Sequence, residues 1–471
     1  MKEIFLVKPI SDLIKETHSE KSLKKVLSAF ELIMFGIGAI VGTGIFVITG
    51  IAAANFSGPA LFLSFVLAGI VCILAALTYA EFASIVPVSG SAYTYSYVSL
   101  GEIWAWIIGW DLILEYTVAI GSVAIGWSGY ITQLLSNIGL VLPPQLVNPP
   151  LSGGIVNLPA IIIIFLITCF LIAGASQSAK LNNIIVAIKI GVILLFIILA
   201  AGHIKPVNWH PFMPFGWNGV IRGAAFVFYA FLGFDAVSTA AEEVKNPQRD
   251  LPKGIIGSLI ICTVLYIIVS VILTGIVPYY KFKGSSAPVA FALEQIGINW
   301  GSALISLGAV CGITSVLLVM TYGGTRIIFA MARDGLLPEH LGRVNARTKT
   351  PILSTIIVGA STAFIAGFFP IDIVSELTNI GTLMAFVIVA IGIIVLREKK
   401  PDLERKFKCP WVPFLPVISA LSCIWLALQL NNVTKLRFLI WLVIGLIIYF
   451  AYGRKHSILN HTSGRDAGQS L

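Results

Sequence analysis

Four ionisable side chains of this 471-residue chain fall inside long apolar stretches, where a charge is costly. Asp111 and Glu115 lie four residues apart and therefore share one face of a helix. Asp235 follows a run of aromatic and small residues, and Lys189 stands alone in an apolar segment. Each of them could bind and release a proton or pair with a charged ligand. The six histidines fall in tails or loops, so a histidine proton relay is not expected.

Lys189 has no carboxylate four residues away on its own helix. It is either a structural residue that reaches a distant acid, or a desolvated amine that gains and loses a proton during a functional cycle. When protonated, it is expected to donate to carbonyls of the first apolar helix or to hydroxyls such as Thr314 and Ser315. An ammonium there would occupy the place of a coupling cation, which favours proton coupling over sodium coupling.

The three acids allow different roles. Glu115 could fix a cationic side chain of a substrate, bind a proton, or bond helix backbone, and the sequence leaves these three open. Asp235 lies at a helix interruption, which favours gating or coupling over a structural role. Asp111 lies nearer one end of its helix and is expected to be structural.

Residues 36–44 carry four glycines near the centre of an apolar stretch. Each glycine costs about 1 kcal/mol of helix propensity relative to alanine. Gly38 and Gly42, four residues apart, fit close packing against a neighbouring helix. Gly42 and Gly44 point to different faces, so the Gly42-Thr43-Gly44 triplet favours a local unwinding that frees backbone N–H and C=O groups.

A second interrupted stretch, residues 226–235, lies in the sixth apolar segment. Interruptions in the first and sixth segments are what a five-plus-five inverted repeat predicts for the substrate site of a secondary transporter. Half-helix N-termini would donate to a carboxylate, and freed carbonyls would accept from an amine. The pattern therefore favours a zwitterionic amino acid over a sugar or an inorganic ion. Phe231 is the aromatic residue expected to close over it.

These residues require membrane-spanning helices to position them. Hydrophobic residues make up 57% of the chain and charged residues 11%, with a mean hydropathy of +0.94, which is typical of an integral membrane protein. We predict an all-α polytopic membrane protein with twelve transmembrane helices, in a leucine-transporter-type repeat of five plus five helices followed by two more. The predicted spans are 29–55, 59–83, 102–134, 155–175, 181–201, 219–243, 254–278, 299–332, 352–369, 373–397, 411–430 and 437–453. The corresponding units are an N-terminal tail (1–28), a first repeat (29–201), a second repeat (219–397), helices 11 and 12 (411–453) and a C-terminal tail (454–471).

The distribution of Lys and Arg fixes the predicted orientation. With both tails inside, 24 of the 31 basic residues fall on the inner side and six on the outer side, and Lys189 lies within a helix. This predicts a multi-pass plasma-membrane protein with cytoplasmic N- and C-termini, whose first residues are a tail and not a signal peptide. Topology thus accounts for the net charge of +9, and no nucleic-acid partner is expected. The six cysteines show no metal-binding or disulfide spacing.

Several motifs together resemble one known group. They are FGIGAIVGTGIF at 35–46, PVSGSAYTY at 87–95, FLGFD at 231–235, EEVKNPQRDLPK at 242–253 and a segment at 326–338 that ends in AMARDGLLP. From about residue 25 to 450 the chain resembles the amino acid, polyamine and organocation transporter superfamily, and within it the cationic amino acid transporter family. The length favours a bacterial member.

The resemblance implies alternating access and a set of site residues. The residues implied to hold the substrate carboxylate are Ile40, Val41, Thr43, Gly44 and Ile45, and those around its amine and side chain are Phe228, Ala230, Phe231, Glu115 and Met320. Tyr93 and Asp235 match positions of a cytoplasmic gate. Lys189 matches the lysine that replaces a sodium site in proton-coupled members.

The predicted function is secondary active transport of L-amino acids, cationic ones such as arginine and lysine and small neutral ones such as alanine, coupled to protons. The expected partners are the amino acid, a proton and the lipid bilayer, without a cofactor or metal, and the sequence gives no indication for or against an accessory membrane subunit. The alternatives are an exchanger without proton coupling and an amino acid sensor that does not transport. The predicted spans contain no evident arrangement of nucleophile, base or metal ligands, so an enzyme is not expected.

Overall fold

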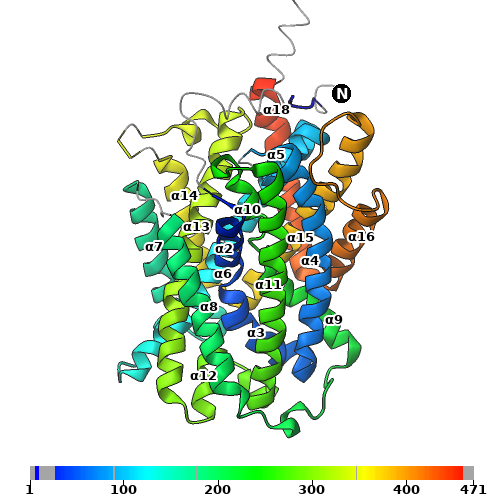
Figure 1. Ribbon diagram of the computed structural model, residues 1–471. Coiled ribbons are helices and arrows are strands. Elements are labelled where there is room, and N and C mark those ends of the chain that lie inside the picture. Colours follow the sequence, from blue (N-terminus) through cyan, green and yellow to red (C-terminus); the bar gives the residue numbers. More distant parts are fainter. Residues whose placement is uncertain are drawn as a thin grey trace, which may run out of the picture.

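The computed structural model describes residues 6–9, 27–88, 91–174, 179–345, 347–348 and 350–459. Most of the predicted N-terminal tail and the end of the C-terminal tail lie outside these residues. The described part is helical, and its one β-type contact is an isolated parallel bridge between Leu27 and Val244. The long helices run upright side by side, and residues 6–9 and α18 (Arg454–His456) lie at the same end, called here the terminal end (Figure 1).

Eight helical stretches in the described residues are long and apolar enough to cross a membrane. They are Gly44–Ile85, Glu102–Asn137, Asn182–Ala201, Gly216–Thr239, Pro247–Ile276, Asn299–Arg333, Ile371–Lys399 and Asn432–His456. Four shorter apolar helices span Ala29–Ile40, Leu158–Ile172, Ile352–Phe368 and Phe414–Gln429. The polytopic helical class is therefore confirmed, and each predicted span overlaps one of these stretches, whereas the count of twelve and the repeat stay predictions.

The main helices have the following bounds. They are α2 (Ala29–Ile40), α4 (Leu61–Ile85), α6 (Glu102–Asn137), α7 (Leu158–Ile172), α8 (Ala179–Ala201), α9 (Gly216–Val227), α11 (Pro247–Ile276), α13 (Asn299–Arg333), α14 (Ile352–Phe368), α15 (Ile371–Lys399), α16 (Phe414–Gln429) and α17 (Asn432–Ile448). Helix α11 begins seven residues before the predicted span because Pro247 occupies its first turn, where no backbone N–H is needed. Two helices outside the predicted spans are α5 (Ser91–Ser99) and α12 (Pro288–Gln295).

Two helical stretches are interrupted, as the sequence predicts. Helix α2 stops at Ile40, Val41 is extended, and the helix resumes from Gly44 as η2 (Gly44–Ile48), α3 (Thr49–Ala52) and η3 (Ala53–Ser57). Helix α9 passes into the 3₁₀ turn η8 (Phe228–Phe231), a non-helical segment 232–235 and then α10 (Ala236–Thr239). Gly233 has φ of +107°, a conformation that other residues rarely adopt. We call these the first break (41–43) and the second break (228–235).

A buried ion-pair cluster joins α4 to α15 and to the loop that follows it. Glu81 is fully buried and accepts hydrogen bonds from Arg397 Nε at 2.9 Å and Nη2 at 2.6 Å and from the backbone N–H of Cys409 at 2.7 Å. Arg405 Nε lies 3.3 Å from the same carboxylate. Because a buried carboxylate needs such partners, this cluster fixes the two helices relative to each other.

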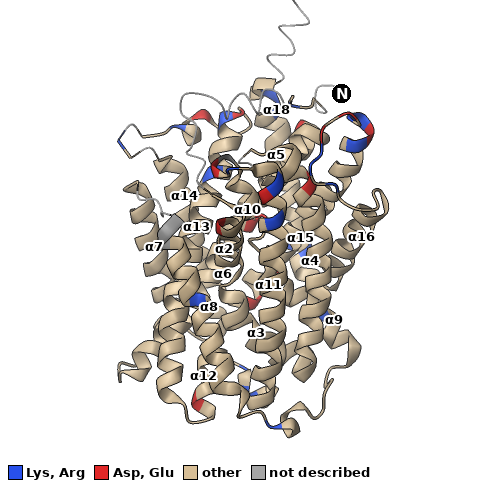
Figure 2. Ribbon diagram, in the orientation of Figure 1, with Lys and Arg blue, Asp and Glu red and all other residues tan. Residues whose placement is uncertain are grey.

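Charged residues gather around the two ends of the bundle and are sparse in its middle (Figure 2). Lys and Arg are especially frequent around the terminal end. The orientation predicted from the positive-inside rule, with the terminal end as the inner side, stays a prediction.

Candidate functional site

The first break leaves carbonyls at the end of α2 that no helical N–H can reach. Lys189 of α8 is fully buried and donates from Nζ to the carbonyl oxygen of Gly38 at 2.6 Å. The expected contact between Lys189 and a freed carbonyl of the first helix is therefore present. Its role in proton coupling stays a prediction.

The hydroxyls that the sequence offered as other partners of Lys189 are engaged elsewhere. Thr314 accepts from Trp127 Nε1 at 2.9 Å, and Ser315 donates to the carbonyl of Gly312 at 3.0 Å. Gly312 itself provides the space that the lysine stem fills, since a Cβ there would lie 2.8 Å from Lys189 Cγ. The amine is thus directed to α2 and not to the side chains of α13.

Tyr266 of α11 connects the two breaks, and the sequence analysis missed it. Its hydroxyl lies 3.0 Å from the carbonyl oxygen of Ile40 and 2.8 Å from that of Ala230, so its single hydrogen is shared between the two. Its ring packs on Phe231, with centroids 5.4 Å apart. One phenol therefore links the end of α2 to the 3₁₀ turn of the second break.

Removing this hydroxyl is expected to loosen both breaks. Tyr266→Phe leaves a buried carbonyl without a donor, which costs about 1–3 kcal/mol of stability. We expect a lower unfolding temperature and an uptake rate about tenfold lower, measured on purified protein and in liposomes. The matched control is Tyr280→Phe, because Tyr280 is 61% exposed. Equal behaviour of the two variants would remove Tyr266 from the site.

The two breaks touch directly at Gly44. A Cβ built on Gly44 would collide with the Cα and Cβ of Ala230. On the other sides of the first break, Thr43 lies against α6, with Oγ1 3.5 Å from the carbonyl oxygen of Val123, and Gly42 faces Val316 of α13. The first break is therefore enclosed by the second break, α6 and α13.

The carbonyls at the end of α9 also have a side-chain donor. Asn379 of α15 donates from Nδ2 to the carbonyls of Ala225 at 2.9 Å and Phe226 at 3.0 Å. This residue is fully buried and was not predicted. An amide inside an apolar run was its only signal in the sequence.

The predicted substrate residues divide into two groups. Seven lie on the breaks or directly next to them and are buried. An eighth, Ile45, follows the first break within η2 and is also buried. Met320 is partly buried on α13, four residues after Val316, so it lies one turn from the residue that faces Gly42. The seven are Ile40, Val41, Thr43, Gly44, Phe228, Ala230 and Phe231.

Glu115 lies on α6, on the terminal-end side of the point where α6 contacts the first break. It precedes Val123 by eight residues on α6, which is about 12 Å along the helix toward the terminal end. It is 7% exposed and near Asp235, which is the last residue of the second break and is 5% exposed. Glu115 therefore lies on the terminal-end side of the first break, near the end of the second.

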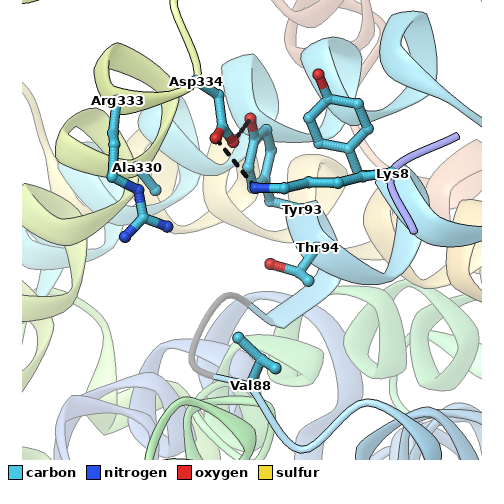
Figure 3. A pocket seen from close by; sticks show the side chains of 8 residues that line it. Lys8, Val88, Tyr93, Thr94, Ala330, Arg333 and Asp334 are labelled. Carbon is cyan, nitrogen blue, oxygen red and sulfur yellow. Dashed lines mark hydrogen bonds and ion pairs between the residues drawn. The ribbon is translucent and has the colours of Figure 1, made fainter. Parts of the chain in front are cut away.

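Of the two residues that match positions of a cytoplasmic gate, Tyr93 has its hydrogen-bond partner at the end of α13. Tyr93 of α5 donates from its hydroxyl to Asp334 Oδ2 at 2.7 Å, and Lys8 Nζ lies 3.4 Å from Asp334 Oδ1 (Figure 3). Burial, with the negative charge of Asp334 beside it, raises the pKa of Tyr93 well above its usual value, so the phenol remains a donor. Asp334 belongs to the AMARDGLLP segment, and its role was not predicted. The small pocket in Figure 3 opens beneath this contact, with Val88 and Thr94 on its far side.

The contact among Lys8, Tyr93 and Asp334 is expected to hold the terminal end closed. Asp334→Asn keeps an acceptor for Tyr93 but removes the ion pair with Lys8. We expect a membrane-impermeant thiol reagent, applied from the terminal side, to label Thr94→Cys about tenfold faster in this variant, in a background without native cysteines. Lys8→Met should have the same effect without adding to it.

The matched control for this prediction is Glu339→Gln. It breaks an ion pair with Arg343 that is exposed at the same end, where both side chains are at least 75% exposed. Its labelling rate should equal that of the parent. A parental rate in Asp334→Asn as well would contradict a closing role.

Known permeases and transporters are similar to this chain over most of its length. Residues 27–451 match the model of the amino acid permease family. The branched-chain amino acid permease BcaP of Bacillus subtilis (strain 168) is 54% identical, over 97% of this chain and 99% of the relative. The methylthioribose transporter of the same organism is 51% identical, over 98% of this chain and 100% of its own length. Human cationic amino acid transporter 4 is 32% identical, over 96% of this chain and 90% of the relative.

All three relatives are named as permeases or transporters and not as enzymes, as the sequence analysis expects. The family match covers both breaks, Lys189, Tyr266 and Asp334. The chain belongs to the amino acid permease family, within the amino acid, polyamine and organocation superfamily.

Proposed function

We propose that this protein carries L-amino acids across the plasma membrane by proton-coupled alternating access, with both chain ends in the cytoplasm. The observation that supports this most is the direct packing of two broken helices, Gly44 against Ala230, with a buried lysine bonded to the first. Twelve spanning helices in a five-plus-five repeat would place these breaks in corresponding positions, the first and sixth.

The backbone of the first break suits the two charged ends of an amino acid. The helix that resumes at Gly44 begins with N–H groups that suit a carboxylate. The carbonyls near Ile40 and Ala230 suit an ammonium, which could share them with or replace the Tyr266 hydroxyl. A zwitterion would therefore be held by backbone groups, while the walls select its side chain.

For the side chain of the substrate, we propose an apolar one of the branched-chain type. The walls around the breaks are formed by Ile40, Val41, Phe228 and Phe231, all of which are buried. The cationic substrates that the sequence suggests would need Glu115, which lies about 12 Å along α6 from Val123, the residue that contacts Thr43 of the first break. The relatives named as branched-chain permeases, 54% and 38% identical, support the same choice.

Methylthioribose is a second candidate, because a relative named as its transporter is 51% identical over nearly the whole chain. This molecule has no carboxylate or ammonium. Its hydroxyls would have to bond the backbone groups that an amino acid would otherwise use. The two candidates therefore differ in whether charge on the ligand is required.

The test is uptake of labelled leucine by liposomes that contain the purified protein, in competition with unlabelled leucine, arginine, alanine or methylthioribose. We expect leucine to compete best, and leucinol, which lacks the carboxylate, to fail. If arginine competes best, the substrate is a cationic amino acid. If methylthioribose competes best, the substrate is methylthioribose and not an amino acid. Uptake only into preloaded liposomes would identify an exchanger, and binding without uptake a sensor.

A further inference from the structure

We propose that Asp111 and Glu115 form a buried carboxyl pair that carries a proton through the transport cycle, with Asp111 as the member nearer the terminal end. This inference rests on the proposed proton-coupled transport, and it assigns a function to Asp111, for which the sequence analysis expects a structural role.

Asp111 is a buried acid whose carboxyl group lacks hydrogen-bond partners. It is 1% exposed, and neither of its oxygens has a hydrogen-bond partner among the described residues. Glu115, one turn further along α6, has one oxygen in the same situation. A carboxylate that is both buried and unpaired is very costly when ionised, so the Asp111 carboxyl is expected to hold a proton in this conformation.

Among the described residues, the groups that act on the pair are acids, phenols and a hydroxyl. Asp235, at the end of the second break, adds a third acid near Glu115, and Tyr79 of α4 and Tyr116 of α6 are neighbouring phenols. Helix α15 contributes Thr382 beside Glu115 and Gly381 beside Asp111. No described Lys or Arg acts on either carboxyl.

Gly381 explains how the structure accommodates Asp111. A Cβ on Gly381 would lie 2.8 Å from Asp111 Oδ1, so the glycine leaves room for the carboxyl without offering it a donor. A structural aspartate of this kind would ordinarily bond a backbone N–H or a hydroxyl. The space without a donor favours a group that exchanges a proton.

Along α6, the pair lies between the first break and the terminal end. Gly109, two residues nearer the terminal end than Asp111 and on a different face of the helix, contacts Met331 and Tyr93, and the Tyr93 hydroxyl bonds Asp334 at the end of α13. Glu115, in the other direction, approaches Asp235 and the second break. The carboxyls therefore lie between the proposed substrate site and the contact that closes the terminal end.

The proposed step is a single proton exchange. When the site is open to the outer side, a proton from water binds a carboxylate oxygen of the pair, which becomes neutral as the substrate is enclosed. When the terminal end opens, water reaches Asp111, the proton leaves to it, and the carboxylate is solvated. One proton enters and one leaves in each cycle, without a change in covalent bonds of the protein.

The test uses Asp111→Asn, which keeps the shape and removes the titrating group, with Asp372→Asn on the exposed start of α15 as the matched control. We expect Asp111→Asn to lose the stimulation of leucine uptake by an imposed inward proton gradient while measurable counterflow exchange remains. In the infrared difference spectrum between Asp111→Asn and the parent at neutral pH, we expect the loss of a carbonyl band of a protonated carboxylic acid. The control should change neither result.

The outcomes separate the two proposals. If the parent itself does not respond to the gradient, proton coupling fails, and the infrared band still reports whether Asp111 holds a proton. If the parent responds and Asp111→Asn responds equally, the inference for Asp111 is overturned. If the variant is inactive in every transport assay, the infrared band decides, and a spectrum without the expected loss overturns the inference.

Discussion

Gly44→Ala is expected to lower leucine uptake by about two orders of magnitude. The added methyl group would meet the Cα and Cβ of Ala230, which are backbone-fixed atoms and cannot rotate away. Overpacking of this kind costs about 1–3 kcal/mol, and here it would separate the two breaks that form the proposed site. We therefore expect loss of substrate binding, measured by the substrate-induced rise in unfolding temperature, together with loss of uptake.

The matched control for Gly44→Ala is Gly191→Ala on α8. No atom outside its own local chain lies within 4 Å of a Cβ built there, so the same chemical change should leave uptake unaltered. Substrate binding of parental strength in Gly44→Ala would show that the contact between the breaks is not part of the site. Loss of binding in both variants would point to a general effect of glycine replacement.

Lys189→Met is expected to abolish accumulation driven by a proton gradient. Methionine has a similar length and no charge, so it can fill the space beside Gly312 that the lysine stem occupies, but it cannot donate to the carbonyl of Gly38. If Lys189 takes part in coupling, the variant equilibrates leucine across the membrane without concentrating it. The unpaired carbonyl of Gly38 should also lower stability by about 1–3 kcal/mol.

The control for Lys189→Met is Lys281→Met, in an exposed 3₁₀ turn, η10 (Tyr279–Phe282), at the opposite end from α18. It should keep the full response to the gradient. A full response in Lys189→Met would show that this lysine only satisfies the broken end of α2. Loss of accumulation in both Lys189→Met and Asp111→Asn would place the amine and the carboxyl pair in one proton pathway.

The helical class and both breaks could be predicted because their causes are local. Apolar runs of spanning length are visible in composition, and the Gly42-Thr43-Gly44 triplet opposes a regular helix in any context. The contact of Lys189 with the first helix could also be predicted, because a buried ammonium needs an acceptor and a broken helix offers carbonyls.

The partners across the bundle could not be predicted in this way. Tyr266 and Asn379 satisfy freed carbonyls, but nothing in their own segments indicates which helix they face. The same is true of Glu81, whose partners Arg397 and Arg405 are more than 300 residues away. These contacts depend on tertiary packing, and the packing of distant helices cannot be inferred from one sequence alone.

The partner of Tyr93 could not be predicted for a related reason. Its hydroxyl reaches Asp334, at the end of α13, and the sequence of α5 does not indicate that contact. Similarly, the distance of Glu115 from the first break follows from where α6 meets Thr43, and helical spacing alone does not reveal that register. A resemblance to a family therefore identifies which residue stands at a position, but it does not show which residue that side chain contacts.

The central claim of proton-coupled amino acid transport is tested most directly by leucine accumulation in sodium-free liposomes across a series of imposed inward pH gradients. Coupling of one proton to one leucine predicts that the inside-to-outside ratio rises about tenfold per pH unit, since each unit corresponds to about 1.4 kcal/mol. A ratio that stays at one for every gradient would contradict proton coupling.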